Sequence, residues 1–337
     1  GLGVATCVAA FIAGVFLVLG FLEDVGYLAR LSYVFDRFMN RLGLHGKSFI
    51  PLGMGFVCNI MAVTGTRVID GWRQRLITLL LAPLIPCKGL LVVISFISIA
   101  FFGFNAIFVF MALAVVMALQ LVLTSFLLRR TVIKGQDFGM IMELPPYHKP
   151  NFKTIRAYAI TRTKAFFRHG YWIIVIAAFL TWAGVYFPDG EIDTSYLARF
   201  GQAVEPFGRI MGMDWRLLLT FLVCFSSKEA TLGAMAVIYG ASSSSRTAIE
   251  GLYMDQGLVS DIQNHFGSFL VNSGISDASA LAFLFAIFFS LPCLGTLGMI
   301  FSETGSYKWT FGSLAYYFLT SIVMGAAAYQ VGLLIFD

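Results

Sequence analysis

The chain carries one pattern of residues twice, and this internal repeat limits the folds that it can adopt. Three landmarks recur in the same order along the sequence. They are Tyr27 to Arg30 with Tyr196 to Arg199, Cys58-Asn59 with Ser227-Lys228, and Pro86-Cys87 with Pro292-Cys293. The third landmark is displaced by an insertion in the second copy, mostly the polar stretch from Gly240 to Asp277. Two halves that each contain a short apolar segment interrupted by Gly, Pro or polar residues are typical of transporters that bind their substrate near the middle of the bilayer.

The composition places these halves in a membrane. Hydrophobic residues make up 58% of the chain and charged residues only 12%, with a mean hydropathy of +0.83. A soluble domain of this composition has too little polar surface to cover itself, so the sequence predicts an all-α integral membrane protein. Four apolar stretches are long enough to cross about 30 Å of hydrocarbon. They are Leu2 to Leu22, Ala106 to Leu128, Tyr171 to Phe187 and Phe311 to Phe336.

Four other apolar stretches are interrupted by helix-breaking or polar residues. They are Ile50 to Thr64, Leu76 to Phe104, Leu217 to Gly240 and Ala278 to Ile300. Irregular backbone at membrane depth is tolerated only where it is buried in protein or lines a wet cavity. We therefore expect a polytopic helical bundle with broken or re-entrant helices. The halves are parallel if Ile50 to Pro86 crosses twice and inverted if it dips in and returns, and known transporter architectures favour inversion.

The excess of positive charge lies in one loop. The segment between Arg129 and His169 is rich in Lys and Arg, with only Asp137 and Glu143 as acidic residues. By the positive-inside rule this loop is cytoplasmic. Its charges are not interleaved with stacking aromatic residues, so no nucleic-acid partner is expected. We predict a first repeat over 1–128, the basic loop over 129–170 and a second repeat over 171–337.

Amphipathic helices are predicted beside the spans. From Tyr27 to Arg41, apolar residues alternate with charged ones at helical spacing, which is typical of a helix that lies on the membrane surface. The second copy extends from Tyr196 to Met211. Within the basic loop, Thr154 to Phe167 is either a third such helix or a solvated linker.

Lys228-Glu229 interrupts an otherwise apolar stretch and follows Ser226 and Ser227. An ionisable residue inside a membrane costs roughly 2.5 to 3.5 kcal/mol on insertion scales, so such residues are candidates for function. We predict Ser227 and Glu229 as metal ligands and Lys228 as a residue that balances charge or acts as a gate. The alternative is an internal ion pair between Lys228 and a carboxylate elsewhere.

Three of the five cysteines lie beside helix breakers. Cys58 lies in a stretch loosened by proline and glycine, and Cys87 and Cys293 each follow a proline. A thiol near free carbonyl and amide oxygens suits a borderline-soft cation such as Fe(II), Zn(II) or Mn(II) better than Mg(II) or Ca(II). We predict these three cysteines as metal ligands. The alternative is apolar packing, which is the role expected of Cys7 and Cys224.

Further polar residues complete the candidate set. Asn59, directly after Cys58, offers an amide oxygen as a ligand. Glu23 and Asp24 end the first span, and Glu303 follows the last broken stretch. Each of these three acids is either an interfacial anchor or part of the acidic mouth of a cation path.

Together these motifs resemble the membrane part of the ferrous iron transport protein B (FeoB) family, which has paired Gate, or nucleoside-recognition-like, motifs. The matching residues extend over nearly the whole chain. They include Leu22 to Tyr27, Gly46 to Pro51, Cys58-Asn59 with Ala62, Ala82-Pro83 with Cys87, Lys228-Glu229, Pro292-Cys293 and Glu303 to Trp309. The resemblance implies two gate repeats that carry Fe(II) across the bacterial cytoplasmic membrane, with the three cysteines as metal-path residues.

The first gate departs from the family pattern at three positions. Met61 stands where the family usually has Pro, and Leu90 and Val92 stand where it usually has Arg and Pro. These departures weaken the expectation of an unwound helix in the first half and of strict specificity for iron.

The resemblance also implies a longer protein, because the family carries an N-terminal cytosolic GTPase domain and further spans. We expect this chain to be the carboxy-terminal portion of such a protein or a divergent relative without the nucleotide switch. GTP and Mg(II) belong only to that domain, and no enzymatic activity is expected of the chain itself. Its expected partners are the lipid bilayer and Fe(II), with a small cytosolic protein, a GTPase domain and a second copy in a homo-oligomer as further candidates.

Two other classes of function fit part of the pattern. The gate motif is shared more widely, and Asn59, Ser227 and Glu229 have groups that bind a sugar or base, so a transporter of a small organic solute such as a nucleoside is the alternative. An intramembrane enzyme is disfavoured, because the chain lacks a paired base such as a histidine embedded in an apolar stretch.

Overall fold

The computed structural model describes most of the chain. The described residues are 13–22, 24–41, 43–69, 71–131, 150–166, 196–226, 228, 231–239 and 275–336, with the single positions 176, 179 and 184. All regular secondary structure in these residues is helical, and they contain no strand. The prediction of an all-α protein is confirmed. The predicted span Tyr171 to Phe187 and the polar insertion after Gly240 lie almost entirely outside this part of the chain.

The described residues of the first half form seven α-helices. They are Ala13–Leu22, α2 (Tyr27–Arg41), α3 (Phe49–Gly55), α4 (Asn59–Gly65), α5 (Trp72–Leu81), α6 (Lys88–Phe102) and α7 (Ala106–Thr131). Single 3-10 turns occupy Gly46–Ser48, Thr66–Val68, Ala82–Leu84 and Gly103–Asn105. α3 and α4 pack along each other as a hairpin, so the chain reverses its direction within the predicted stretch Ile50 to Thr64.

The described helices of the second half repeat this order. They are α10 (Tyr196–Ile210), α11 (Trp215–Ser226), α12 (Thr231–Ile238), α15 (Asp277–Phe288), α16 (Leu294–Thr304) and α17 (Tyr307–Phe336). α10 corresponds to α2, the α11–α12 pair to the α3–α4 hairpin, and the interrupted α15–α16 to α5–α6. All four apolar stretches that the sequence predicts to be broken are broken, which confirms the prediction of interrupted helices.

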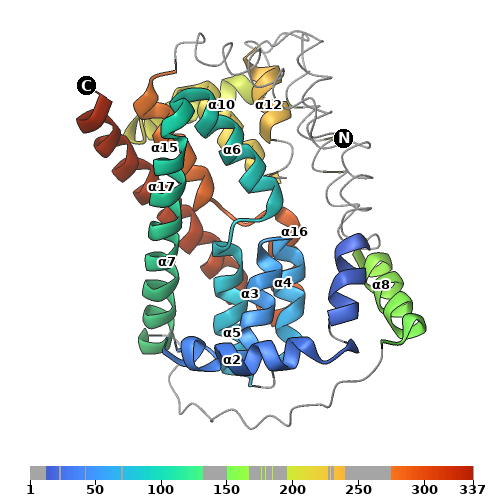
Figure 1. The fold of residues 1–337 in the computed structure, drawn as a ribbon. Coiled ribbons are helices and arrows are strands. Elements are labelled where there is room, and N and C mark those ends of the chain that lie inside the picture. Colours follow the sequence, from blue (N-terminus) through green and yellow to red (C-terminus); the bar gives the residue numbers. More distant parts are fainter. Residues whose placement is uncertain are drawn as a thin grey trace.

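The two halves have opposite orientations. In Figure 1, α2 lies across the lower end of the molecule, whereas its counterpart α10 lies at the upper end. The α3–α4 hairpin occupies the lower half, and α12 lies in the upper half. This is the arrangement expected of an inverted repeat in which each hairpin enters from its own side.

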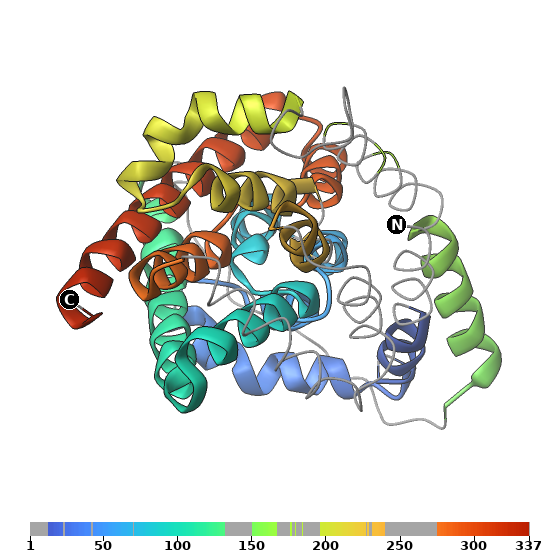
Figure 2. The ribbon, with the colours of Figure 1, turned by 90° about the horizontal axis from the view of Figure 1, so that it is seen from above.

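α8 (Phe152–Phe166) packs outside the bundle against the helix Ala13–Leu22, as both ribbon views show (Figures 1 and 2). Tyr158 lies edge-on to Phe16, with ring centroids 6.3 Å apart, and a Cβ added at Gly20 would lie 3.0 Å from the Tyr158 ring. Of the two alternatives for this part of the basic loop, the helix is therefore correct. The loop from 132 to 149 lies outside the described residues.

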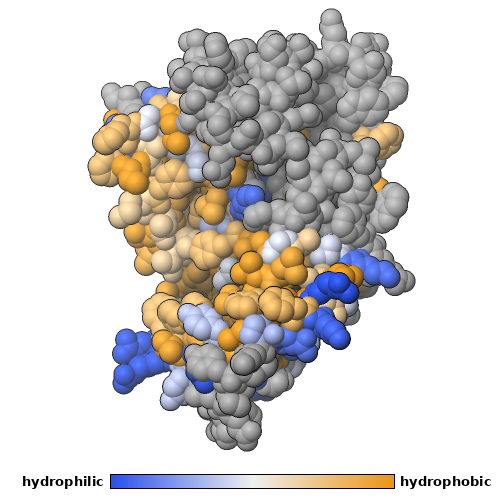
Figure 3. All heavy atoms as spheres, turned by 45° about the vertical axis from the view of Figure 1, so that its right-hand side comes forward, coloured by the Kyte–Doolittle hydropathy of each residue, from blue (hydrophilic) through white to orange (hydrophobic). Residues whose placement is uncertain are grey.

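Apolar surface and charge are separated along the molecule. Two helical runs, Trp72–Arg130 and Tyr307–Ile335, are long and apolar enough to cross a membrane. α7 and α17 expose large apolar side chains such as Phe108 (70%) and Leu319 (64%). Figure 3 shows apolar residues across the middle of one face and hydrophilic residues toward its lower end. We call that lower end, formed by α2, the turn Thr66–Val68, the start of α5 and the end of α7, the basic end.

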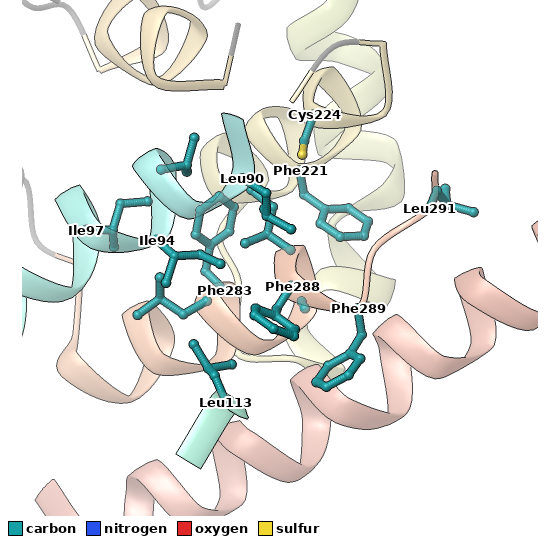
Figure 4. Packing of buried hydrophobic residues seen from close by; sticks show 14 of the residues in the cluster. Leu90, Ile94, Ile97, Leu113, Phe221, Cys224, Phe283, Phe288, Phe289 and Leu291 are labelled. Carbon is teal, nitrogen blue, oxygen red and sulfur yellow. The ribbon is translucent and has the colours of Figure 1, made fainter. Parts of the chain in front are cut away.

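The main apolar core joins the two halves above the hairpin tip. Leu90 and Ile94 of α6 meet Phe221 of α11 and Phe283 of α15 (Figure 4). Leu90, which stands where the family usually has Arg, is only 1% exposed and is part of this core. Because each half supplies part of this core, neither half buries its apolar faces alone.

Candidate functional site

Each of the three predicted metal-path cysteines stands immediately before a helix. Cys58 precedes α4, Cys87 precedes α6 and Cys293 precedes α16, with ψ angles of 127°, 165° and 155°. All three are thiols of intermediate burial that form no disulfide within the described residues. α6 and α16 begin there with N–H groups that have no partner within the helix, and this positive end favours a negatively charged ligand. A metal-bound thiolate is therefore stabilised at these two positions.

The breaks have local causes in the sequence. Pro86 and Pro292 lack the N–H that a continuous helix requires, so α5–α6 and α15–α16 are interrupted directly before their cysteines. The tip of the α3–α4 hairpin has no such proline, and Met61 is buried inside α4. The helix nevertheless unwinds at Cys58, which is fully extended. The departure at Met61 therefore does not abolish the break in the first half.

Asn59 fixes the hairpin tip to its surroundings. It is 3% exposed, and with its amide nitrogen facing the backbone it donates hydrogen bonds of 3.1 Å to the carbonyl oxygens of Gly55 and Ile85. Both carbonyls lie next to breaks, where helical partners are missing. Asn59 thus has a structural role through its nitrogen, and its amide oxygen is directed away from these two carbonyls.

The hairpin tip lies between the breaks of the two halves. On one side Asn59 is bonded to Ile85, two residues before Cys87. On the other side a Cβ added at Gly295 would lie 2.7 Å from Ile60 Cδ1, so α4 and α16 approach each other closely where both begin. These contacts bring the chain segments of all three metal-path cysteines to one region.

Lys228 occupies the position in the second half that matches Asn59. It is 4% exposed, and its carbonyl oxygen accepts a hydrogen bond from Thr231 Oγ1 at 2.9 Å. Within the described part of the chain, its ammonium group has no hydrogen-bond partner. Ser227 and Glu229, its predicted companions, lie outside the described residues. A buried cation is costly at membrane depth, which makes a role for this charge more plausible than simple packing.

Cys224 is a thiol near Lys228 that the sequence assigned to packing alone. It is fully buried in the main core (Figure 4). It interacts electrostatically with Lys228 and Cys293, and it faces the hydroxyl groups of Thr231 and Ser290. Cys224 lies only four residues before Lys228 in the sequence, and this short separation is the signal that sequence reasoning missed.

The thiols do not form a ready-made metal site within the described residues. No three His, Cys, Asp or Glu side chains in this part of the chain are close enough together to hold one ion. Cys293 Sγ instead lies 3.1 Å from Thr296 Oγ1, one turn into α16. The cysteines are therefore separate ligand groups around one region.

Glu303 lies at the end of α16, and its side chain is only 2% exposed. Arg67, in the turn after α4, donates from Nε to Glu303 Oε1 at 2.7 Å, and Arg75 of α5 pairs with Oε2. The hydrogen bond to Glu303 raises the pKa of the Arg67 guanidinium above its ordinary value. Two positive groups thus surround one buried carboxylate.

The other two acids proposed for a pore mouth are placed differently. Asp24 accepts a hydrogen bond of 2.7 Å from the backbone N–H of Asn151, next to the start of α8. This contact is typical of the interfacial anchor that was the alternative to a mouth. Glu23 lies outside the described residues.

Comparison with known proteins assigns this arrangement to a class. The family described as "Gate: Nucleoside recognition" matches residues 6–104 and 171–307, which is well over half of the chain. The chain therefore belongs to the Gate family. A second family, described as "Ferrous iron transport protein B C terminus", matches residues 91–162. The resemblance to the membrane part of ferrous iron transport protein B is confirmed.

Individual relatives agree with this assignment. The chain is 31% identical to the Fe(2+) transporter FeoB of Methanocaldococcus jannaschii, over 100% of the chain and 49% of that protein. It is 33% identical to the Fe(2+) transporter FeoB of Staphylococcus aureus, over 98% of the chain and 48% of that protein. A fusion of Fe(2+) transport protein A with the transporter FeoB from Porphyromonas gingivalis is 30% identical, over 95% of the chain and 42% of the fusion. The chain thus spans about half the length of the curated relatives it matches. No solved structure matches it.

Proposed function

We propose that this chain is the membrane part of a transporter that carries Fe(II) across a bacterial cytoplasmic membrane. The observation that carries the proposal is the position of Cys58, Cys87 and Cys293 at helix breaks that meet between the two halves. The names of the relatives support the choice of metal. Residues 1–128 and 171–337 form the two gate repeats in this proposal, and 129–170 is the loop between them.

The proposed orientation of the protein in the membrane follows from the distribution of its positive charges. Arginines gather at the basic end, including Arg67 and Arg75 beside Glu303 and Arg129, which packs against Gly43. By the positive-inside rule this end faces the cytoplasm. The α3–α4 hairpin then enters from the cytoplasmic side, and the α11–α12 pair enters from the outside in a multi-pass membrane protein.

The thiols supply ligands that Fe(II) prefers over competing hard cations. Thiolate sulfur lowers the cost of removing water from Fe(II) much more than from Mg(II), so a soft ligand set selects for iron. Cys87 and Cys293 lie at helix N-termini that favour the negative charge of a bound thiolate. The oxygen atoms of Asn59, Ser227 and Glu229 complete the proposed ligand set.

Lys228 keeps the region from holding a metal ion too firmly. Its buried ammonium group repels a cation near Cys224 and Cys293, so conduction combines attraction by thiolates with repulsion by this charge. Binding that is too tight would stop transport, because an ion has to leave as readily as it enters. In this proposal Lys228 therefore balances the charge of the thiolates or acts as a gate.

The whole protein extends beyond this chain. Its relatives are about twice as long, and we propose that the remainder includes the GTPase domain with its GTP and Mg(II). The fusion of transport protein A with FeoB in one relative supports a small cytosolic protein as a partner. A second copy of the protein, in a homo-oligomer, is a further proposed partner. The chain itself acts as a transporter and not as an enzyme.

Metal binding tests the proposal directly. Anaerobically reduced protein with Cys58→Ser, Cys87→Ser and Cys293→Ser together should bind Fe(II) at least about 10-fold more weakly than wild type, since even outer-shell changes cost that much. Mn(II) and Mg(II) serve as competitors, and Cys7→Ser is the matched control because Cys7 lies in an uninterrupted apolar stretch. Unchanged Fe(II) binding and uptake in the triple variant would contradict the proposal.

A small organic solute is the alternative substrate. The family description names nucleoside recognition, but the relatives are named as Fe(2+) transporters, so iron is the favoured substrate. Displacement of Fe(II) by a nucleoside, or nucleoside uptake that is insensitive to chelators, would support it. Fe(II) binding that a nucleoside does not affect would leave the metal as the substrate.

A further inference from the structure

We propose that Glu303, Arg67 and Arg75 form a latch that closes the cytoplasmic end of the path. The proposal rests on the proposed transport function, and it assigns to Glu303 a role in the closed state. Arg67 Nη2 lies 2.6 Å from Glu303 Oε1, and Arg75 pairs with Oε2, so each carboxylate oxygen has its own guanidinium partner. We refer to these three residues as the latch.

The latch joins two half-helices that start at the metal-path cysteines. α4 begins after Cys58, and the next turn, Thr66–Val68, carries Arg67; α16 begins after Cys293 and carries Glu303 in its last turn. The two helices touch at their beginnings, where Ile60 meets Gly295. They therefore extend side by side from the thiols to the latch, and one belongs to each half of the molecule.

The space between the thiols and the latch is filled by apolar side chains. A separate core cluster contains Ala62 and Val63 of α4 and Ile300 of α16, with Leu76, Leu79 and Leu80 of α5. An ion that leaves the thiols toward the cytoplasm has to separate these side chains. The latch holds the cluster closed, because α4, α5 and α16 move apart only when the ion pairs break.

The charge of the latch also opposes a cation. Two arginines and one glutamate leave a net positive charge, so Fe(II) meets repulsion at a closed exit. When the latch opens, the Glu303 carboxylate loses its partners and becomes an oxygen ligand that faces the cytoplasm. Glu303 thus holds the path closed through its ion pairs in the closed state. In the open state, its carboxylate forms the acidic mouth that the sequence suggested.

Within the described residues, the positions of the other half that correspond to the latch carry no ion pair. At the positions that correspond to Arg67, Arg75 and Glu303, the other half has Ala236, Leu281 and Ile97. Leu281 and Ile97 are buried in the main core. Among the described residues, these two counterparts contribute apolar packing in place of an ion pair, and we infer that the two halves of the inverted repeat differ in their gates.

Thiol accessibility measures the latch without any metal. The test uses full-length chain in inside-out membrane vesicles, with Cys58 as the only remaining cysteine and a membrane-impermeant maleimide added on the cytoplasmic side. Glu303→Gln should increase the labelling rate several-fold, because two unpaired arginines then repel each other. Arg73→Gln is the matched control, since Arg73 is an exposed arginine of the same helix as Arg75.

A second variant separates opening from misfolding. The combination Arg67→Gln, Arg75→Gln and Glu303→Gln leaves no unpaired charge and keeps a polar side chain at all three positions. It should retain the elution profile of wild type and still label several-fold faster from the cytoplasmic side, with no change in right-side-out vesicles. Wild-type labelling rates in a folded triple variant, or faster labelling from the outside, would overturn the latch.

The same variants distinguish failure of the latch from failure of the transport proposal. Faster labelling without any Fe(II) binding would show that the latch exists in a protein that does not carry iron. Normal Fe(II) binding with unchanged labelling would leave the transport proposal standing and remove the latch.

Discussion

At the scale of single residues, one pair of matching positions shows how the two halves differ. Asn59 is an amide that bonds to the carbonyls of Gly55 and Ile85, whereas Lys228 in the matching position is an ammonium group with no hydrogen-bond partner in the described residues. The first half therefore has a fixed hairpin tip. The second half instead has the buried positive charge of Lys228 at the matching position.

Asn59→Ala should destabilise the protein by about 1 to 3 kcal/mol, because two buried carbonyl oxygens lose their only side-chain donor. Chemical denaturation in detergent, followed by tryptophan fluorescence, measures the change. Asn59→Asp should be worse still, since a carboxylate would face two carbonyls. Asn105→Ala, on an exposed turn, is the control. Equal stability of the Asn59 and Asn105 variants would show that the hydrogen bonds of Asn59 do not stabilise the hairpin tip.

At the scale of elements, α15 and α17 form the most extensive helix–helix contact in the described structure. Small residues allow the approach: a Cβ added at Gly325 would lie 3.0 Å from Ala286 Cβ, and one at Gly332 would lie 2.9 Å from Ala278 Cα. Ser321 Oγ also donates to the Ala286 carbonyl at 2.7 Å. In a membrane, where lipid is as apolar as the side chains, such close packing and interhelical hydrogen bonds drive association.

Gly332→Ala should lower stability by about 1 to 3 kcal/mol, because the added methyl group meets the backbone of α15 and forces the helices apart. The matched control lies in the same helix: Gly312 has nothing within 4 Å of an added Cβ, so Gly312→Ala should be neutral. Thermal unfolding in detergent compares the two. If both substitutions have the same effect, the packing of α15 on α17 does not depend on small residues.

At the scale of the whole molecule, the opposite orientation of the two halves decides how the path is built. α2 and α10, which share a sequence motif, lie at opposite ends, and the thiol-bearing breaks lie between them. A path through such a molecule has a gate at each end. In the described residues, the ion pairs of the proposed latch lie at the basic end.

Cysteines introduced at Asn40 of α2 and Gln202 of α10 should be labelled from opposite sides of the membrane, because both positions are exposed on helices at opposite ends. The measurement uses Asn40→Cys and Gln202→Cys in a cysteine-free background, with an impermeant maleimide in vesicles of each orientation. Labelling of both from one side would exclude inverted halves.

The sequence by itself determined the features that depend on neighbouring residues. Composition and apolar length predict a helical membrane protein, and proline or polar residues predict where its helices break, because helix formation and burial are read from local periodicity. Placement of the cysteines at those breaks follows from the same local signals. The family resemblance then added iron as the candidate substrate.

Only the tertiary structure decided which distant residues meet. The contact of Ile60 with Gly295 and the pairing of Arg67 with Glu303 depend on how the two inverted halves pack. The bond from Asn59 to Ile85 depends on how the hairpin packs within the first half. From the sequence, Glu303 is either an interfacial anchor or part of an acidic mouth, because a charge next to a helix end gives no sign of partners more than 200 residues away. Local patterns fix the period and the ends of helices, but the faces that they bury against each other are chosen by the packing of the whole chain.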